Sequence, residues 1–201
     1  MMICDEVMMG WGRTGEMFAF ENWDVKPDLV SFAKGITCGY VPLGGVIVDK
    51  KIADYFDDHK LMCGLTYSGH PLACAAGIAT LDVYKEEKLV ERSKAMGKVL
   101  GQIEEELKRK HPCVGDVRYK GLFSAIELVK DKETKEPLVE YNKDPENIMG
   151  GIIGELKKKG FSTYSHENNI IVAPPLIITE TELRDAMAIM DEVLTDVDAM
   201  I

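Results

Sequence analysis

The 201-residue chain has the composition of a globular protein, and its charge excludes several classes of partner. Hydrophobic residues make up 46% of the sequence and aromatic residues 7%, which is enough to build a buried core. The 24 basic and 34 acidic residues give a net charge of -10, which disfavours binding to nucleic acid or to an anionic membrane surface. We therefore expect neither nucleic acid nor membrane among its partners.

No segment has the pattern of a membrane span, a secretion signal or a metal site. The apolar runs are too short to cross a membrane, and the first residues lack the basic segment and cleavage pattern of a signal peptide. The five cysteines are dispersed, with no Cys-x-x-Cys pair and no histidines at zinc-ligand spacing. These features predict a cytoplasmic protein with free thiols and no bound metal.

The first 50 residues predict three strands, with a lysine directly after the second. Residues 2–7 are apolar except for the acidic pair that begins at Asp5, which is typical of a buried strand that delivers carboxylates at its C-terminal end. Two further short strands are predicted at residues 28–33 and 43–48. Lys34 therefore lies where a strand gives way to a loop.

Two helices follow, and the pattern then becomes richer in strands. Residues 70–87 repeat small apolar side chains at helical spacing, which predicts a largely buried helix. Residues 89–110 predict a second, amphipathic helix, which His111 and Pro112 end. Beyond it we expect strands at 114–119 and 121–129, a helix at 145–159, strands at 161–164 and 170–173, and a last helix at 180–197 with Leu183, Met187, Met190 and Leu194 facing inward.

The order of these elements indicates an α/β protein with two parts. Residues 1–111 are expected to form the later portion of a mixed, mainly parallel sheet with helices. Residues 112–201 are expected to form a small α+β domain. The boundary is therefore predicted between residues 111 and 112.

Several motifs that are common singly occur here in one order and spacing. They are Asp5-Glu6-Val7, Gly10-Trp11-Gly12-Arg13-Thr14-Gly15, Pro27-Asp28-Leu29-Val30, Ala33-Lys34-Gly35, Pro42-Leu43-Gly44-Gly45-Val46, Thr66-Tyr67-Ser68-Gly69-His70-Pro71 and Ala173-Pro174-Pro175-Leu176. Together they make the chain resemble the class III (ω-amino acid type) aminotransferases of fold type I. The resemblance implies pyridoxal 5'-phosphate as cofactor and an aspartate aminotransferase-like sheet in residues 1–111.

The resemblance assigns catalytic roles to Lys34 and Asp5. Transamination needs an amine that condenses with the cofactor aldehyde, is displaced by substrate and then moves a proton as general base. Lys34 matches that lysine, so the reaction would pass through an aldimine on Lys34. Asp5 matches the aspartate that keeps the pyridine nitrogen protonated, so that the ring can accept electrons.

Two more residues match cofactor-binding positions of the family. Thr66 resembles the threonine that reaches the cofactor phosphate of the neighbouring subunit, because a hydroxyl with adjacent N–H groups suits an anion. Val7 matches a residue that packs on the cofactor ring. The resemblance therefore implies a homodimer, with Lys34, Asp5, Val7 and Thr66 as cofactor-binding residues.

The match is weaker where relatives recognise their substrates. Residues 165–172 contain no arginine to grip a substrate carboxylate. The pattern from Thr66 to His70 favours the taurine–pyruvate and β-alanine–pyruvate subgroup. The sequence therefore predicts an amine or ω-amino acid as donor and a keto acid such as pyruvate as acceptor.

The resemblance also implies that the family's first half is missing, together with its own phosphate-binding loop and several strands. We expect an N-terminal half supplied by another polypeptide to complement the chain, or the chain to be a fragment. Two alternatives stay open. One is a catalytically silent folding or dimerisation module, and the other is an aminomutase or decarboxylase with the same cofactor.

Overall fold

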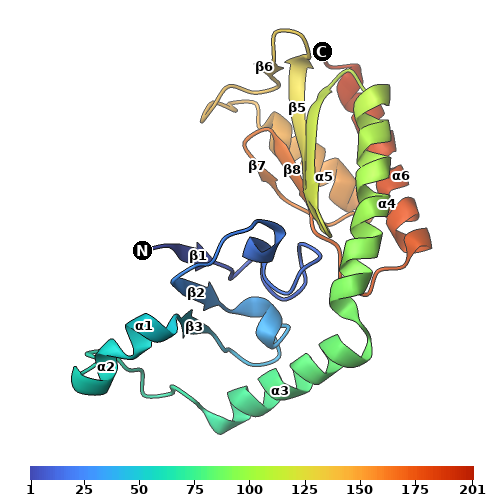
Figure 1. Cartoon of the computed structure of the whole chain (residues 1–201). Helices are drawn as coiled ribbons and strands as arrows, with labels where there is room; N and C mark the ends of the chain where they lie inside the picture. Colours follow the sequence, from blue (N-terminus) through green and yellow to red (C-terminus); the bar gives the residue numbers. More distant parts are fainter. The chain divides into compact units, whose positions relative to one another are not determined.

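A computed structural model describes residues 1–201, and the chain divides into two compact units, Met1–Arg92 and Ser93–Ile201 (Figure 1). The division lies inside helix α4 (Leu89–Lys110), whereas the sequence predicts a domain boundary between residues 111 and 112. The two positions differ because the later turns of α4 bury their leucines in the core of the second unit. The boundary after residue 111 stays a prediction.

A three-stranded mixed sheet forms the centre of the first unit. In spatial order its strands are β1 (Ile3–Asp5), β2 (Leu29–Phe32) and β3 (Gly45–Val48). Strands β1 and β2 run parallel, and β2 and β3 run antiparallel, as a mixed sheet requires. Gly45 pairs with Phe32, and a Cβ atom at Gly45 would lie 2.6 Å from Cζ of Phe32, so the glycine makes room for that ring.

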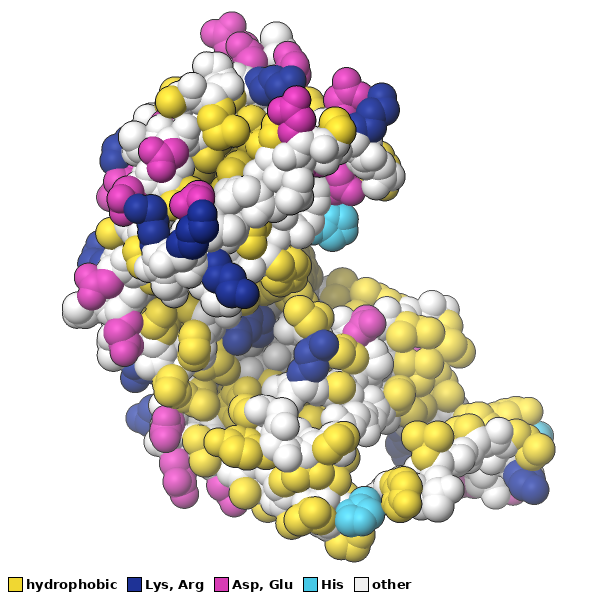
Figure 2. All heavy atoms as spheres, turned by 180° about the vertical axis from the view of Figure 1, so that it is seen from behind, with side chains coloured by type: hydrophobic (Ala, Val, Ile, Leu, Met, Phe, Trp, Pro, Cys, Tyr) yellow, Lys and Arg dark blue, Asp and Glu magenta, His cyan; other side chains and the backbone are white.

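Strands β1 and β3 of the first unit are largely exposed, and the prediction of a buried strand at residues 2–7 was wrong. Ile3 is 63% exposed, and the three valine and isoleucine side chains at the end of β3 are each at least 39% exposed. Since successive side chains of a strand point to opposite faces, β3 is open on both faces. Burial depends on elements that cover a sheet, which a strand's own sequence does not reveal. Broad hydrophobic areas are visible in Figure 2.

Short helices and one long helix complete the first unit. They are the 3-10 helices η1 (Ala19–Asn22) and η2 (Lys34–Ile36), and the α-helices α1 (Lys50–Ala53), α2 (Tyr55–Asp58) and α3 (Pro71–Glu86). The sequence analysis did not predict α1 and α2. Only Ala73, Gly77 and Tyr84 of α3 are buried, so the prediction of a largely buried helix was wrong for the same reason as in β1.

An antiparallel sheet with helices forms the second unit. Its strands are β4 (Val114–Lys120), β5 (Phe123–Asp131), β6 (Glu136–Pro137), β7 (Ser165–His166) and β8 (Asn169–Val172), and its helices are the later turns of α4, α5 (Ile148–Lys158) and α6 (Glu180–Asp198). The strand order is β4-β5-β8-β7, and β6 pairs with β5. Apart from β6, which the sequence analysis did not predict, and the strand discussed next, these elements follow the predicted order.

Strand β7 lies closer to the turn than predicted. The sequence predicts a strand at 161–164, but the structure has a two-residue strand in which Ser165 pairs with Ile170 and His166 with Asn169. Glu167 in the turn has a φ of 50°, and this left-handed conformation permits a tight two-residue turn between β7 and β8. The residues nearest the turn therefore pair, and His166 remains exposed on this hairpin.

Helix α6 supplies much of the core of the second unit. Leu183, Met187, Met190 and Leu194 are at most 1% exposed, as their helical spacing predicts. A capping box fixes the start of the helix, because Thr179 accepts the N–H of Glu182 and the Glu182 carboxylate accepts the N–H of Thr179. The apolar face of α6 is thereby held in register on the sheet.

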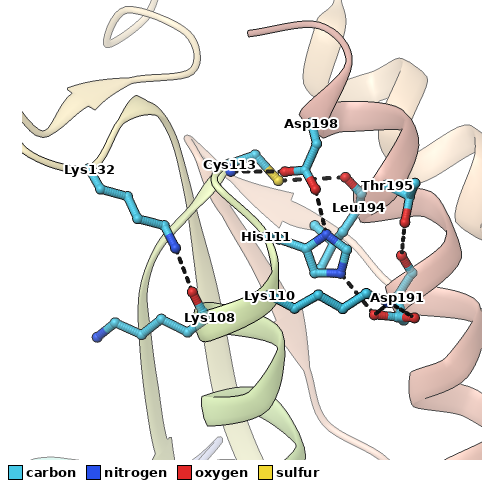
Figure 3. A network of polar contacts seen from close by, with 9 residues as sticks. All are labelled: Lys108, Lys110, His111, Cys113, Lys132, Asp191, Leu194, Thr195 and Asp198. Atoms are coloured by element: carbon cyan, nitrogen blue, oxygen red, sulfur yellow. Dashed lines mark hydrogen bonds and ion pairs between the residues drawn. The ribbon is translucent and has the colours of Figure 1, made fainter.

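A buried histidine joins the end of α4 to α6 (Figure 3). Nδ1 of His111 lies 2.6 Å from a carboxylate oxygen of Asp198, and Nε2 lies 2.8 Å from one of Asp191. Lys110 pairs with Asp191, and the N–H of Cys113 donates to Asp198. Burial alone would raise the pKa of both aspartates, but the hydrogen bonds donated by these neighbours outweigh it and lower the pKa. The cluster ties two helices of the second unit together.

Asn168 provides a test of how side chains stabilise this unit. Its buried amide accepts the N–H of Val139 at 2.8 Å and donates to the carbonyl of Val139 at 2.9 Å. We expect Asn168→Ala to lower the free energy of unfolding by about 2 to 3 kcal/mol, because both main-chain groups lose their partner. Urea denaturation measures this, with the exposed Glu140→Ala as control, and equal stability of the two variants would contradict it.

Candidate active site

A cavity in the first unit brings together two of the four site residues that the sequence analysis singled out, Lys34 and Thr66. It has a volume of about 1090 Å³, at the upper end of the range for ligand pockets. Its wall is formed by the segment that follows β2, by residues 65–70 and by the first turn of α3. Lys34 and Thr66 both lie on this wall, although the resemblance assigns them to sites in two different subunits.

Lys34 is placed by a short rigid segment. It starts η2 directly after β2, and its φ of 45° is in the left-handed region, which is costly for a residue with a side chain. The N–H of Thr37 donates to the Lys34 carbonyl at 3.2 Å, and the Thr37 hydroxyl donates to the carbonyl of Val41 at 2.6 Å. Ile36 and Thr37 are buried, so the main chain is anchored while the Lys34 side chain stays exposed to the cavity.

Helix α3 brings the Thr66 segment to the same cavity. Gly77 lies against Leu43 and Ile36, and a Cβ atom at Gly77 would lie 3.1 Å from a methyl carbon of Leu43. This close approach sets α3 against the segment that carries Lys34. His70 caps the helix by accepting the N–H of Leu72 at 3.2 Å, and Pro71 occupies the first position. The preceding turn is thereby directed along the cavity wall.

The wall has the chemistry of an anion site. Lys34 is its one lysine or arginine, and no aspartate or glutamate lies on it. The hydroxyl-bearing side chains of Thr66, Tyr67 and Ser68 lie on the wall, and Ser68 Oγ accepts the N–H of Leu65 at 3.2 Å. A cation with several hydroxyl donors and no carboxylate suits a phosphate or another anion. These residues therefore fit a phosphorylated aldehyde that reacts with an amine.

Asp5 and Val7 are not part of this cavity wall. Asp5 ends β1 and pairs with Ser31 of the parallel strand β2, three residues before Lys34. Because the C-terminal ends of parallel strands meet at one edge of a sheet, Asp5 and Lys34 share that edge. Asp5 is exposed, and one of its carboxylate oxygens accepts the N–H of Val7 at 3.0 Å. Its second oxygen accepts no hydrogen bond that the structure records.

Glu6 has a structural role in the loop after β1. Its buried carboxylate accepts the N–H of Ala19 at 2.8 Å and of Phe20 at 2.9 Å, and so caps η1. Burial of the Arg13 guanidinium in the same loop lowers its pKa, and burial raises the pKa of Tyr84 to about 12. These groups stabilise the loop and lie outside the cavity wall.

The structure has neither a candidate metal site nor a candidate membrane-spanning helix. No group of three or more histidine, cysteine, aspartate or glutamate side chains could hold a metal ion. No helix combines the length and apolarity that a membrane crossing requires.

Comparison with known proteins gives one family. The family model described as Aminotransferase class-III matches residues 1–194. The solved taurine:2-oxoglutarate aminotransferase from Bifidobacterium kashiwanohense, in complex with PLP and glutamate, is 53% identical with a TM-score of 0.95, and the match covers 98% of this chain and 44% of that chain. The taurine–pyruvate aminotransferase of Bilophila wadsworthia is 34% identical over 98% of this chain and 45% of its own.

Matches to other relatives have the same extent. An uncharacterized aminotransferase of Bacillus subtilis is 40% identical, and the match covers 91% of this chain and 42% of the relative. The chain thus spans less than half the length of the relatives it matches.

Proposed function

This chain belongs to the class III aminotransferase family, and from that premise we propose that it supplies the lysine-bearing part of an active site for pyridoxal-phosphate-dependent amino-group transfer. The observation that carries the proposal is the position of Lys34 on the wall of a large cavity. The side chains on this wall include one lysine and several hydroxyl groups, and they include no carboxylate. Family membership supports the cofactor, and the chemistry of the wall supports the attachment point.

We assign four residues to the reaction. The Lys34 amine would hold the cofactor through its aldehyde carbon and, once released by substrate, would act as the general base that moves a proton from the amine-bearing carbon of the substrate to that cofactor carbon. The Asp5 carboxylate holds the proton on the pyridine nitrogen, and its position at the edge shared with Lys34 supports this. Thr66 binds the phosphate in the neighbouring subunit, and Val7 packs on the ring. When bound, pyridoxal phosphate accepts the electrons that the substrate carbon releases.

For the substrates we propose an amine or ω-amino acid donor and a keto acid acceptor. Two of the similar proteins are named for taurine as donor, one with pyruvate and one with 2-oxoglutarate as acceptor. Taurine is a primary amine two carbons from a sulfonate, so it fits a donor class defined by a terminal amine and a remote anion. The absence of arginine in residues 165–172 means that this stretch supplies no guanidinium for that anion.

We further propose that a second polypeptide covers the first unit, either another copy of this chain or an N-terminal half of the family type. Exposed hydrophobic side chains on β1, on β3 and at residues 61–67 support this, because open strand edges and large apolar areas are normally covered. Tyr67 and Leu65 on the cavity wall are each at least 78% exposed. The second polypeptide would therefore also form part of the cavity wall.

Product analysis tests the proposed function. The purified chain is incubated with pyridoxal phosphate, taurine and either pyruvate or 2-oxoglutarate. A parallel sample adds the part of the Bifidobacterium protein that the match leaves out. We expect alanine or glutamate to form in equal amounts with the aldehyde derived from taurine. A rearranged amine would identify an aminomutase, and carbon dioxide released from an ω-amino acid with a carboxylate, offered in place of taurine, would identify a decarboxylase. No product in either sample would support the silent module.

A further inference from the structure

The side chain of Trp11 packs against residues on both sides of Lys34, namely the ring of Phe32 and the main chain at Gly35. Its ring meets the ring of Phe32 edge-on at a centroid distance of 5.3 Å, two residues before the lysine. On the other side, a Cβ atom built at Gly35 would lie 2.8 Å from Cβ and 3.0 Å from Cδ1 of Trp11. Gly35 therefore lies directly on the tryptophan, and the segment that carries Lys34 is held against one flat side chain.

Trp11 is itself fixed in an unfavourable state. Its φ of 62° lies in the left-handed region, and its buried Nε1 has no hydrogen-bond partner. The ring packs on Phe18 at 5.1 Å, and the Trp11 N–H donates to the carbonyl of Met17 at 2.6 Å. A strained backbone and an unpaired buried N–H are both costly, and such costs concentrate where geometry serves a site.

The neighbours of Lys34 are constrained from the other directions too. Phe32 is fixed by its pairing with Gly45, whose missing side chain admits the phenyl ring. Ile36 is buried, and its segment lies against α3. Lys34 keeps its own left-handed conformation only because these contacts hold it. Trp11 adds a further contact, to Phe32 before the lysine and to Gly35 after it.

We propose that Trp11 is a positioning residue, which sets the main-chain direction of Lys34 and so directs its amine into the cavity. Trp11 does not line the cavity, so it acts only through the lysine. A lysine side chain has four rotatable bonds, and a loosened main chain would add further freedom before the amine reaches an aldehyde. Orientation of this kind accounts for a large part of the rate of reactions between bound groups. The inference rests on the proposed function of Lys34.

The test compares Trp11→Leu with Trp11→Phe, and uses the chain's other tryptophan, in Trp23→Leu, as the matched control. Attachment of pyridoxal phosphate forms a C=N bond at Nζ and releases water, and borohydride reduces that bond to a stable amine. Peptide mapping at timed intervals gives the rate at Lys34 relative to the exposed Lys60. The rates are measured across pH, with the unfolding temperature of each variant.

We expect Trp11→Leu to slow attachment at Lys34 by about tenfold and to leave Lys60 unchanged. Trp11→Phe keeps a flat ring and should restore the wild-type rate to within about twofold, as should Trp23→Leu, since both keep the ring contact. A folded Trp11→Leu protein that attaches the cofactor at the wild-type rate, with the same pH profile, would overturn the proposal. If Trp11→Leu does not fold, Gly35→Ala replaces it, because the added methyl group would displace Trp11 at their contact. We expect slower attachment at Lys34 in that variant, and a wild-type rate would overturn the proposal.

Hydrogen exchange tests the positioning role of Trp11 independently of the proposed role of Lys34 in cofactor attachment. If the wild-type chain shows no preference for Lys34 over Lys60, the proposed function fails. Amide exchange in residues 33–37 still reports the main chain in the absence of cofactor. We expect faster exchange there in Trp11→Leu than in Trp23→Leu, and equal protection in the two variants would overturn the positioning role.

Discussion

Lys34→Ala is expected to abolish amino-group transfer, with a rate at least about 10³-fold below that of the wild-type chain. The variant removes both the amine that attaches the cofactor and the base that moves the proton, and no other lysine or arginine lies on the cavity wall. The rate is measured as alanine or glutamate formed from taurine, in whichever preparation supports turnover.

Lys60→Ala is the matched control for this prediction. Lys60 is an exposed lysine of the same unit that does not line the cavity, so the control should keep wild-type turnover. Added methylamine or ethylamine should restore part of the activity of Lys34→Ala, because a free amine can act as the missing base. Turnover by Lys34→Ala equal to that of Lys60→Ala would show that another group performs the chemistry.

Glu104→Gln is expected to stabilise the chain at alkaline pH. Burial raises the pKa of Glu104 to about 8, although the Ser124 hydroxyl donates to one carboxylate oxygen. The other oxygen is buried without a partner. Since the folded pKa lies above the ordinary value of 4.5, the protonated form stabilises the fold fully below about pH 4.5. That contribution is lost as the pH rises towards 8, because the unfolded chain ionises first.

The size of the effect follows from the difference between the two pKa values. Each unit contributes about 1.4 kcal/mol, so the wild-type chain should lose up to about 5 kcal/mol of unfolding free energy between pH 4.5 and pH 8 from this group. Glu104→Gln removes this loss. Urea denaturation across that range measures it, with Glu106→Gln on the exposed face of α4 as control. Parallel curves for wild type and Glu104→Gln would contradict the prediction.

The elements of the second unit could be predicted from the sequence because their signals are local. The spacing of Leu183, Met187, Met190 and Leu194 defines the buried face of α6, and all four are buried in the structure. His111 and Pro112 mark the end of α4, which stops at Lys110. In both cases the residues that determine the structure lie within the element or directly next to it in the sequence.

Burial in the first unit could not be predicted, because it depends on segments that the strands do not encode. The apolar residues of β1, β3 and α3 have the composition of buried elements, yet most are exposed in this chain. The same residues would be buried if a second polypeptide covered them. A pattern of apolar residues reports the tendency to be covered and does not report what covers them.

The candidate site also combines features that could be predicted from the sequence with features that depend on contacts between distant residues. Lys34, Asp5, Val7 and Thr66 were predicted because their motifs occur in the family's order, and their roles stay proposals. Tyr67, Ser68 and His70 also lie on the cavity wall, and the motif from Thr66 to Pro71 pointed to that segment without assigning these three residues to the site. Its approach to Lys34 depends on Gly77 packing against the segment after β2, which is a contact between distant parts of the sequence.

The attachment point of pyridoxal phosphate tests the central claim most directly. The wild-type chain and Lys34→Ala are mixed with the cofactor, with and without the complementing polypeptide, then reduced with borohydride and mapped by mass spectrometry. We predict a single major adduct on the peptide that carries Lys34, and its loss in the variant. Adducts spread equally over exposed lysines such as Lys60 in both preparations would contradict the account, because the cavity would then confer no preference on Lys34.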